Sequence, residues 1–486
     1  MINAGSQLAQ VAAPLGCLGL ALLLVARDRP LRLAGLAAWG AGAAGLAVSL
    51  APDGHNALLA AAAAAGAVLA AAGAFVLLRW PWVLPFAALA CIPFRIPVDV
   101  GDEEANLLLP LYLVVSALAL AFGWRLLRGD DRGRELGPAA LPLAAFAAWS
   151  GVSLIWSEDV REGSIFLLAF VLPFGLLAIG LARLPWNRRG LVWLYGALAA
   201  TALVFASVGI FQWVTRDVFW NPRVIVGNAY APFYRVNSVF WDPSIYGRYL
   251  VVAILATLVL VLLGLRGRKL AGAAAVIAAL WAGLLFSFSQ SSFVSLVAGT
   301  LAAAAIVWRW RAAAAIGLVA LVLISVGFAT PQVRGKLLRE SRAGLNAATS
   351  GRAGLVSNGL RIAVDHPLDG VGVGGFKRAY ADRTGREPRR AASHSTPVTV
   401  AAEAGVLGVL LLGWLAVAAL GSAFRSRGRT DAGTLALVAG LTLGAIAVHS
   451  LFYNALFEDP TSWALLGLIA LAAGRRAEER QQEGPT

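Results

Sequence analysis

Charged residues are scarce in this chain. Only 14% of its 486 residues are Asp, Glu, Lys or Arg, 59% are hydrophobic, and the mean hydropathy is +0.74. Soluble domains carry about 25% charged residues, so a soluble fold is excluded. Cysteine is nearly absent: Cys17 and Cys91 both lie in apolar runs, which excludes a disulfide framework and a cysteine metal site. Four histidines occur without an HExxH or CxxC pattern, which leaves a soluble metalloenzyme or redox protein without support.

Apolar stretches close to 20 residues recur along the whole length, each long enough to cross the roughly 30 Å hydrocarbon core as a helix. They are rich in Ala and Gly, which let helices approach closely. We predict an all-α polytopic integral membrane protein, a bundle of about 12–15 transmembrane helices. The N-terminus lacks the basic region and cleavage site of a signal peptide, so the first stretch is expected to stay as a span. The predicted spans are 8–26, 33–50, 57–78, 82–96, 106–124, 138–156, 164–182, 191–213, 241–264, 270–287, 291–308, 312–329, 397–420, 432–454 and 460–474. The stretch 82–96 is short and interrupted by two prolines, which allows a re-entrant or tilted segment.

The formal charge of +14 could suit nucleic acid or an anionic membrane, and its distribution decides between them. Basic residues fill alternate short connections, whereas the intervening ones are neutral or acidic, a pattern that follows the positive-inside rule. It predicts a multi-pass plasma (inner) membrane protein with the N-terminus outside, the C-terminus in the cytoplasm, membrane lipids as partners and no nucleic-acid partner. The basic connections hold Arg27, Arg29, Arg32, Arg79, Arg125, Arg128, Arg132, Arg134, Arg183, Arg188, Arg189, Arg266, Arg268, Lys269, Arg309, Arg311, Arg425, Arg427 and Arg429.

Two long connections, 214–240 and 330–396, fall on the predicted outer side. The second carries twelve Lys or Arg, which suggests an anionic ligand at the outer face; a solvated loop or lipid headgroups would also explain them. The predicted organisation is therefore N-terminal transmembrane helices (1–213), an extracytoplasmic loop (214–240), transmembrane helices (241–329), a large extracytoplasmic loop (330–396), C-terminal transmembrane helices (397–474) and a cytoplasmic tail (475–486).

The large loop divides into three parts. Residues 349–364 suit an amphipathic interface helix, which Thr349 or Ser350 could cap. Residues 366–376 (HPLDGVGVGGF) contain four glycines that permit a tight backbone path or merely a flexible turn. His394 then stands just before a span, with Glu403 about two turns inside it. A histidine at the membrane boundary can take a proton from a hydroxyl, and an intramembrane Glu is a site candidate by default. The alternative for His394 is a solvated loop residue, and His55, His366 and His449 are interpreted as loop or packed residues.

The other outer loop ends in RVNSVFWDPSIYGRYL, residues 235–250. Arg235 and Arg248 flank aromatic residues, and Asp242-Pro243 stands where a span should start. The arginines could hold a phosphate bidentately, and Trp241 or Tyr246 could stack on a sugar. The simpler interpretation of the aromatics is an interfacial belt.

These segments together resemble the O-antigen ligase and Wzy-type polymerase superfamily. The resemblance runs through RVNSVFWDPSIYGRYL, FSFSQSSFVSLVAG (286–299), TSGRAGLVSNGLRIAVDHPLDGVGVGGF (349–376), SHSTPVTVAAEAGVLG (393–408) and NALFEDPTSWALLGL (454–468), in the family's order. Two departures stand out. The arginine that often follows the family's S-x-S is Ser292 or its neighbours here, and the family's Pro-Asn is Pro243-Ser244.

The resemblance implies a C-type glycosyltransferase-like bundle that moves a glycan from a polyprenyl diphosphate carrier to an acceptor hydroxyl at the outer face. His394 would be the catalytic base, and Arg235 and Arg352, with Arg248 and Arg361 in reserve, would bind the pyrophosphate; Glu403 and Asp242 would support the site. Attack opposite the leaving group would invert the anomeric carbon. No outer carboxylate cluster is convincing, so we expect neither a metal nor a cofactor.

Other functions remain open. The acceptor could be a glycan, a lipid or a protein hydroxyl, so a ligase, a polymerase and a protein O-oligosaccharyltransferase all fit. A lipid-linked glycan flippase or transporter is the alternative outside enzymes. It would place charges along the spans, whereas here the spans are nearly free of charge.

Overall fold

The computed structural model describes residues 4–51, 56–100, 103–130, 132–230, 233–311, 314, 317, 352–385 and 393–483. Within this part of the chain, twelve helices are long and apolar enough to cross a membrane. Apart from one short hairpin, the regular structure described is helical. The predicted all-α polytopic membrane bundle is therefore confirmed.

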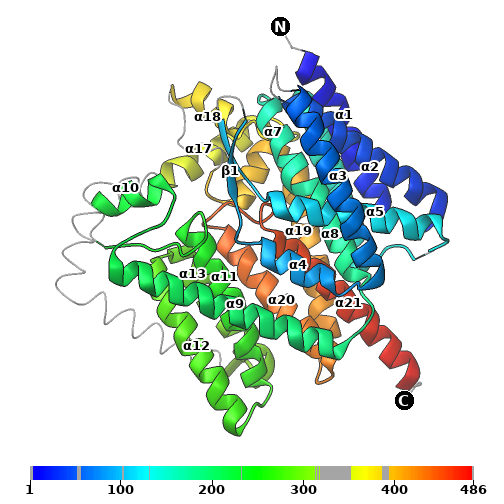
Figure 1. The fold of residues 1–486 in the computed structure, drawn as a ribbon. Coiled ribbons are helices and arrows are strands. Elements are labelled where there is room, and N and C mark those ends of the chain that lie inside the picture. The colour runs from blue at the N-terminus through cyan, green and yellow to red at the C-terminus, as the bar shows by residue number, and fades with distance from the viewer. Residues whose placement is uncertain are drawn as a thin grey trace.

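The N-terminal half contains a closely packed group of helices and one hairpin (Figure 1). Its elements are α1 (Ala4–Val25), α2 (Arg29–Leu50), α3 (Asn56–Arg79), α4 (Val83–Cys91), β1 (Ile96–Val100), β2 (Glu103–Leu107), α5 (Leu109–Leu127), η1 (Gly137–Ala139), α6 (Ala140–Ser153), η2 (Leu154–Trp156), α7 (Val160–Phe166), η3 (Leu167–Val171), α8 (Leu172–Ala182) and α9 (Arg188–Thr215).

The C-terminal half adds membrane helices and three shorter helices. Its elements are α10 (Pro222–Tyr230), α11 (Pro243–Leu262), α12 (Gly267–Ser287), α13 (Gln290–Trp308), α17 (Arg352–Asp365), α18 (Phe376–Thr384), α19 (Thr396–Ser426), α20 (Asp431–Ser450) and α21 (Pro460–Glu483). The main hydrophobic core joins the two halves, because α6 and α8 pack against α19 and α21 around the buried ring of Trp463.

The predicted span 82–96 is not one continuous helix. Its helical part, α4, has nine residues and is about 14 Å long at 1.5 Å per residue, half of what the hydrocarbon core requires. The chain then forms the antiparallel hairpin β1–β2, in which Ile96 faces Leu107. Figure 1 shows β1 rising from α4 toward the end of the molecule where α7 and α18 lie.

Two other predicted spans need comment. The stretch 312–329 lies almost entirely outside the described residues, as does 330–351 of the large loop with its possible caps Thr349 and Ser350. The stretch 460–474 forms the first part of α21, which continues as a helix through the predicted tail to Glu483.

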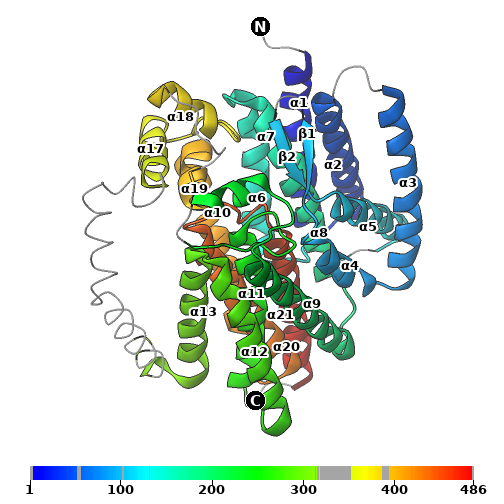
Figure 2. The ribbon, with the colours of Figure 1, turned by 60° about the vertical axis from the view of Figure 1, so that its left-hand side comes forward.

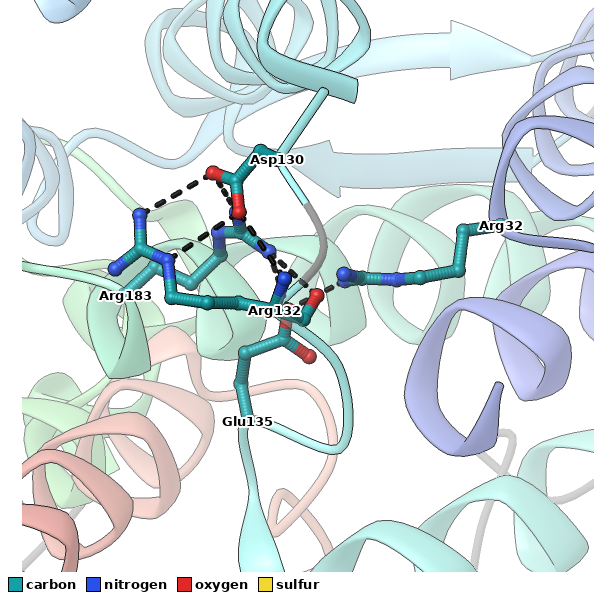
Figure 3. Close-up of polar contacts among 5 residues, drawn as sticks. All are labelled: Arg32, Asp130, Arg132, Glu135 and Arg183. Atoms are coloured by element: carbon teal, nitrogen blue, oxygen red, sulfur yellow. Dashed lines mark hydrogen bonds and ion pairs between the residues drawn. The ribbon is translucent and has the colours of Figure 1, made fainter. Parts of the chain in front are cut away.

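A buried ion-pair cluster ties together three connections that the charge pattern assigned to the cytoplasm (Figure 3). Arg32 of α2 and Arg183, directly after α8, both donate to Glu135. Arg183 also pairs with Asp130, which accepts from Arg132 at 3.2 Å. Burial raises the pKa of Asp130, but hydrogen bonds from Arg132 and Arg183 outweigh it and hold that pKa below its usual range. The carboxylate is therefore charged throughout the neutral range.

We predict that Glu135→Gln lowers the melting temperature of the detergent-solubilised protein. The amide would leave the buried guanidiniums of Arg32 and Arg183 without their anionic partner, a loss of about 3–5 kcal/mol for buried pairs. Asp365→Asn is the control, since its partner Arg383 and Asp365 itself are both partly exposed. The measurement is thermal unfolding followed by tryptophan fluorescence. If both variants had the melting temperature of the wild type, the prediction would be contradicted.

The two ends of the bundle differ in what they carry. Figures 1 and 2 show α7, α17, α18 and the start of α1 at one end, and the end of α21 at the other. The first end contains α7, whose N-cap is Asp159, and the described part of the large loop, so it is the end predicted to face outward.

Cysteine labelling tests that orientation. In a background with Cys17 and Cys91 replaced by Ala, we predict that Asp382→Cys in α18 reacts with an impermeant maleimide on intact cells. Gly428→Cys, between α19 and α20, should react only after permeabilisation. External labelling at 428 would reject the orientation.

Candidate functional site

The span that begins beside His394 is broken at Gly405. This glycine has φ 64° and ψ −164°, so α19 is two helical segments meeting at a kink. A Cβ at Gly405 would lie 2.3 Å from the carbonyl oxygen of Leu368, which shows how closely the 366–376 segment approaches the break. That segment also replaces the lost helical hydrogen bonds: Val406 N donates to Pro367 O at 2.8 Å.

The other side of the same segment packs against the connection between α6 and α7. Gly372 and Gly374 have φ values of 83° and 81°, which favour glycine. A Cβ on Gly374 would lie 2.2 Å from the backbone nitrogen of Gly163. Ser157 Oγ donates to Val373 O at 2.7 Å, and Val373 N donates to Ser153 Oγ at 3.2 Å. Residues 370–376 therefore follow the tight backbone path that their glycines permit, and they are buried between α19 and the connection from α6 to α7 rather than forming a flexible turn. We call these residues the glycine wedge.

Glu403, predicted to support the site, holds this wedge in place. Its Oε1 accepts from Phe376 N at 3.4 Å, and the neighbouring carbonyl of Ala402 accepts from Val371 N at 2.9 Å. On the opposite face, Trp149 Nε1 donates to Ala404 O at 2.9 Å. The Glu-Ala-Gly sequence at 403–405 thus combines a kink with the groups that fasten the glycine segment to it.

We predict that Gly374→Ala disrupts the fold locally and lowers both melting temperature and any activity. The methyl group meets backbone atoms that cannot move aside, in a conformation that disfavours L-residues. Gly413→Ala is the matched control, because it lies inside α19 with nothing within 4 Å of the added carbon. Removing a helical glycine there should be neutral or stabilising by up to about 1 kcal/mol. If Gly374→Ala had the melting temperature and the activity of the wild type, the close packing at Gly374 would be rejected.

His394 lies at the start of α19 in a constrained turn. It is 8% exposed and has φ 69°, an unfavourable conformation for a residue with a Cβ. Ser393 secures the turn, since its Oγ lies 2.9 Å from Thr399 Oγ1 and donates to Ser395 O at 2.9 Å. Backbone strain held by surrounding hydrogen bonds is concentrated at functional sites. His394 is therefore a fixed side chain rather than a solvated loop residue.

A series of side chains leads from His394 into the bundle. Its ring meets Tyr453 edge-on with 6.4 Å between centroids, and Tyr453 packs against His449 of α20 at 5.6 Å. The Nε2 of His449 lies 3.0 Å from Ser291 Oγ at the start of α13. Sequence patterns gave His449 no role, and the structure places it, fully buried, on the far side of Tyr453 from His394.

The turn between α12 and α13 is lined with buried serines. Ser289 caps α13, and its Oγ lies 2.8 Å from Ser292 Oγ. Arg235 reaches this turn, because its Nε donates to Ser287 O at 3.2 Å. On the other side α11 comes close, with a Cβ at Gly247 placed 2.6 Å from Ser292 Oγ. The position where the family often carries an arginine is therefore approached here by Arg235 and by the helix that bears Arg248.

Arg248 is the most deeply buried of the predicted phosphate ligands. Its Nε pairs with Asp459 Oδ2 at 2.7 Å, and the side chains are 2% and 7% exposed. Both terminal nitrogens of Arg248 are buried without a hydrogen-bond partner among the described residues. His449 lies close enough to Arg248 for their charges to interact. A desolvated guanidinium with two free donors is suited to an oxyanion.

The remaining predicted residues have different positions. Asp242 caps α11 by accepting from Ser244 N at 2.7 Å, which is a structural role. Arg352 begins α17 and is partly buried, whereas Arg361, later on the same helix, is exposed. The structure therefore links His394 to the serine turn through Tyr453 and His449, and Arg235 donates to the same turn. Arg248 acts on His449 by its charge, and Arg361 lies at the surface.

Tyr453 and Asp459 were missed because their roles depend on contacts with residues distant in sequence. A signal for Asp459 existed: Asp459-Pro460 opens α21 as Asp242-Pro243 opens α11, and Asp459 Oδ1 accepts from Thr461 N at 2.9 Å. Among the described residues, no group of three or more His, Cys, Asp or Glu is arranged to hold a metal ion.

These features define a polytopic membrane protein with a buried histidine, tyrosine and arginine group at one end of its bundle. Residues 273–413 match the family model described as O-antigen ligase. The matched residues include most of α12, all of α13, α17 and α18, and the first part of α19 to a point past its kink. The match supports membership of the O-antigen ligase superfamily. The resemblance found in the sequence is thus confirmed, and the family supports ligase- or polymerase-type glycosyl transfer in general. No curated protein matches the chain.

Proposed function

We propose that this protein transfers a glycan from a polyprenyl diphosphate carrier to an acceptor hydroxyl at the outer face of the plasma membrane. The observation that carries the proposal is that one group of side chains includes both a histidine in a constrained turn and a buried arginine with two unpaired nitrogens. His394 packs on Tyr453, Tyr453 packs on His449, and the charge of Arg248 acts on His449.

The chemistry requires two functions of the protein. A base must take the proton of the acceptor hydroxyl, and positive charge must stabilise the departing diphosphate. His394 supplies the base. Arg248 and Arg235 supply the charge, with Arg352 approaching from α17 once the carrier is bound. The hydroxyl oxygen forms its bond to the anomeric carbon while the carbon–oxygen bond to the diphosphate breaks, which inverts the anomeric configuration.

The apolar bundle suits the lipid part of the donor. The carrier's hydrocarbon chain would enter laterally between spans, and α17 would cover the reacting groups. This helix packs inward through Ile362 and leaves Leu360 and Val364 exposed. Exposed apolar residues on a short surface helix are expected at the lipid interface. A ligase, a polymerase and a protein O-oligosaccharyltransferase share this machinery and differ in the acceptor.

We predict separable effects for the two kinds of residue. His394→Ala should lower the transfer rate about 10²–10⁴-fold and leave carrier affinity unchanged, because general-base loss affects the transition state. Arg235→Ala and Arg248→Lys should weaken carrier binding as well as turnover, since a lysine keeps the charge beside Asp459 but not the guanidinium fork. The measurement is transfer of labelled lipid-linked oligosaccharide by purified variants, with carrier affinity determined in parallel.

Arg383→Ala is the control for these arginines, because Arg383 pairs with Asp365 on the same end of the molecule and has no proposed role. Wild-type transfer by His394→Ala would reject the mechanism, and unchanged carrier affinity in both arginine variants would reject the phosphate site.

The same transfer assay should be insensitive to EDTA, because in the proposed mechanism arginines alone neutralise the charge of the leaving group. Loss of turnover in EDTA that Mg²⁺ or Mn²⁺ restores would assign that task to a metal.

A further inference from the structure

A cavity lies at the start of α19, where Thr396, two residues after His394, is one of its lining residues. It lies between α6, α7, the glycine wedge, the start of α19 and the connection before α21, with about 690 Å³ of empty space, open solvent included. Its lining residues are Phe146, Ser150, Ser153, Glu162, Phe166, Val373, Gly374, Thr396, Thr399, Val400, Glu403, Ala404, Asn454, Ala455, Leu456, Phe457 and Glu458. We call it the acidic pocket.

The lining of the acidic pocket does not suit a diphosphate. Glu162, Glu403 and Glu458 line it, and no Lys or Arg is among its lining residues. Burial raises the pKa of Glu458, and the charges of Arg95 and Arg248 act against that rise. Carboxyl, hydroxyl and amide groups accept hydrogen bonds from neutral hydroxyl groups. An anionic ligand would find no guanidinium or ammonium group in this lining.

One group in the pocket points directly to a ligand. Thr396 is 2% exposed, and its Oγ1 has no hydrogen-bond partner among the described residues. A buried hydroxyl left unpaired costs about 1–3 kcal/mol and is rare in folded proteins. Because Thr396 lines the pocket, a bound hydroxyl would complete its hydrogen bonding.

The apolar walls fit the same class of ligand. Phe146 and Phe457 stack with 4.5 Å between ring centroids, and Phe166 lines the pocket as well. Ligand sites typically combine apolar and aromatic walls with a few placed polar groups. Aromatic walls with scattered hydroxyls and carboxyls suit a sugar, whose ring presents C–H faces and O–H edges.

The position of the pocket relative to the reacting groups is defined by chain neighbours. Thr396 is two residues after His394, and Asn454 follows Tyr453, on which His394 packs. Glu458 precedes Asp459, the partner of Arg248. The pocket is thus close in the chain both to His394 and to the ion pair of Arg248 with Asp459.

We propose that the acidic pocket binds the acceptor as a neutral saccharide and presents one of its hydroxyls to His394. This assignment rests on the proposed function. The acceptor hydroxyl loses its proton to His394, its oxygen bonds to the anomeric carbon of the donor, and the electron pair of the broken bond leaves with the diphosphate. Thr396 and Glu458 are then acceptor-binding residues, and the acceptor class is carbohydrate rather than protein.

Binding can be measured without turnover. The probe is a panel of neutral mono- and disaccharides, the class proposed for the acceptor, titrated against purified protein by saturation-transfer difference NMR. Thr396→Val and Glu458→Gln should each weaken binding about five- to tenfold, the effect of one lost hydrogen bond. Thr396→Val removes an unpaired hydroxyl from the free protein, so its melting temperature should not fall.

Ser462→Ala is the matched control. Ser462 is 4% exposed, its Oγ also lacks a partner among the described residues, and it lines an apolar pocket beside α19 and α20 instead. The Ser462→Ala variant should bind the probe with the affinity of the wild type. Absence of wild-type binding, or wild-type affinity in both Thr396→Val and Glu458→Gln, would overturn the acceptor assignment. Saccharide binding with the expected losses but no transfer by the wild type would reject the proposed function alone.

Discussion

The contact between the broken turn of α19 and the glycine segment 366–376 determines the geometry of the site. A helix that breaks inside a membrane protein frees backbone groups that no water can satisfy, so another part of the chain must replace their partners. Here the glycine segment does so at Val406 and Ala402, and only glycine permits the approach at positions 370, 372, 374 and 405. The large loop is thereby fastened to the membrane bundle beside His394 instead of moving independently of it.

Arginines and carboxyls come together within a few residues of one another in this region. Arg248 and Arg235 lie with the serine turn of α12 and α13, and Glu403 and Glu458 line the pocket, with Glu458 directly before Asp459, the partner of Arg248. In the proposed transfer, the arginines would stabilise the diphosphate of an anionic donor, and the carboxyls would accept hydrogen bonds from the hydroxyls of a neutral acceptor.

Much of the fold could be predicted from the sequence because length and hydropathy dictate a membrane helix almost alone. The stretch 82–96 was placed among the spans with a re-entrant or tilted segment left open, because composition does not show where its nine helical residues give way to a hairpin. His394, Arg235 and Arg248 could be selected from local motifs. The pairing of Arg248 with Asp459 joins residues far apart in the chain, and neither local pattern nor periodicity reports such a contact. The kink at Gly405 could not be predicted for the same reason, because it depends on contacts with the segment 366–376.

Arg248 also shows why the bundle carries a costly group in its interior. Burying a guanidinium is unfavourable unless its charge and its donors are both satisfied, and Asp459 satisfies only one nitrogen in the described structure. At the opposite end, Arg183 shares two carboxylates and packs its guanidinium 4.9 Å from the ring of Phe122. There Arg32 and Arg183 share Glu135, although Arg32 Nε and Nη1 and Arg183 Nε also lack a hydrogen-bond partner among the described residues. In the proposed transfer, the two unpaired terminal nitrogens of Arg248 would donate to an incoming oxyanion, and Asp459 would fix the orientation in which they are presented.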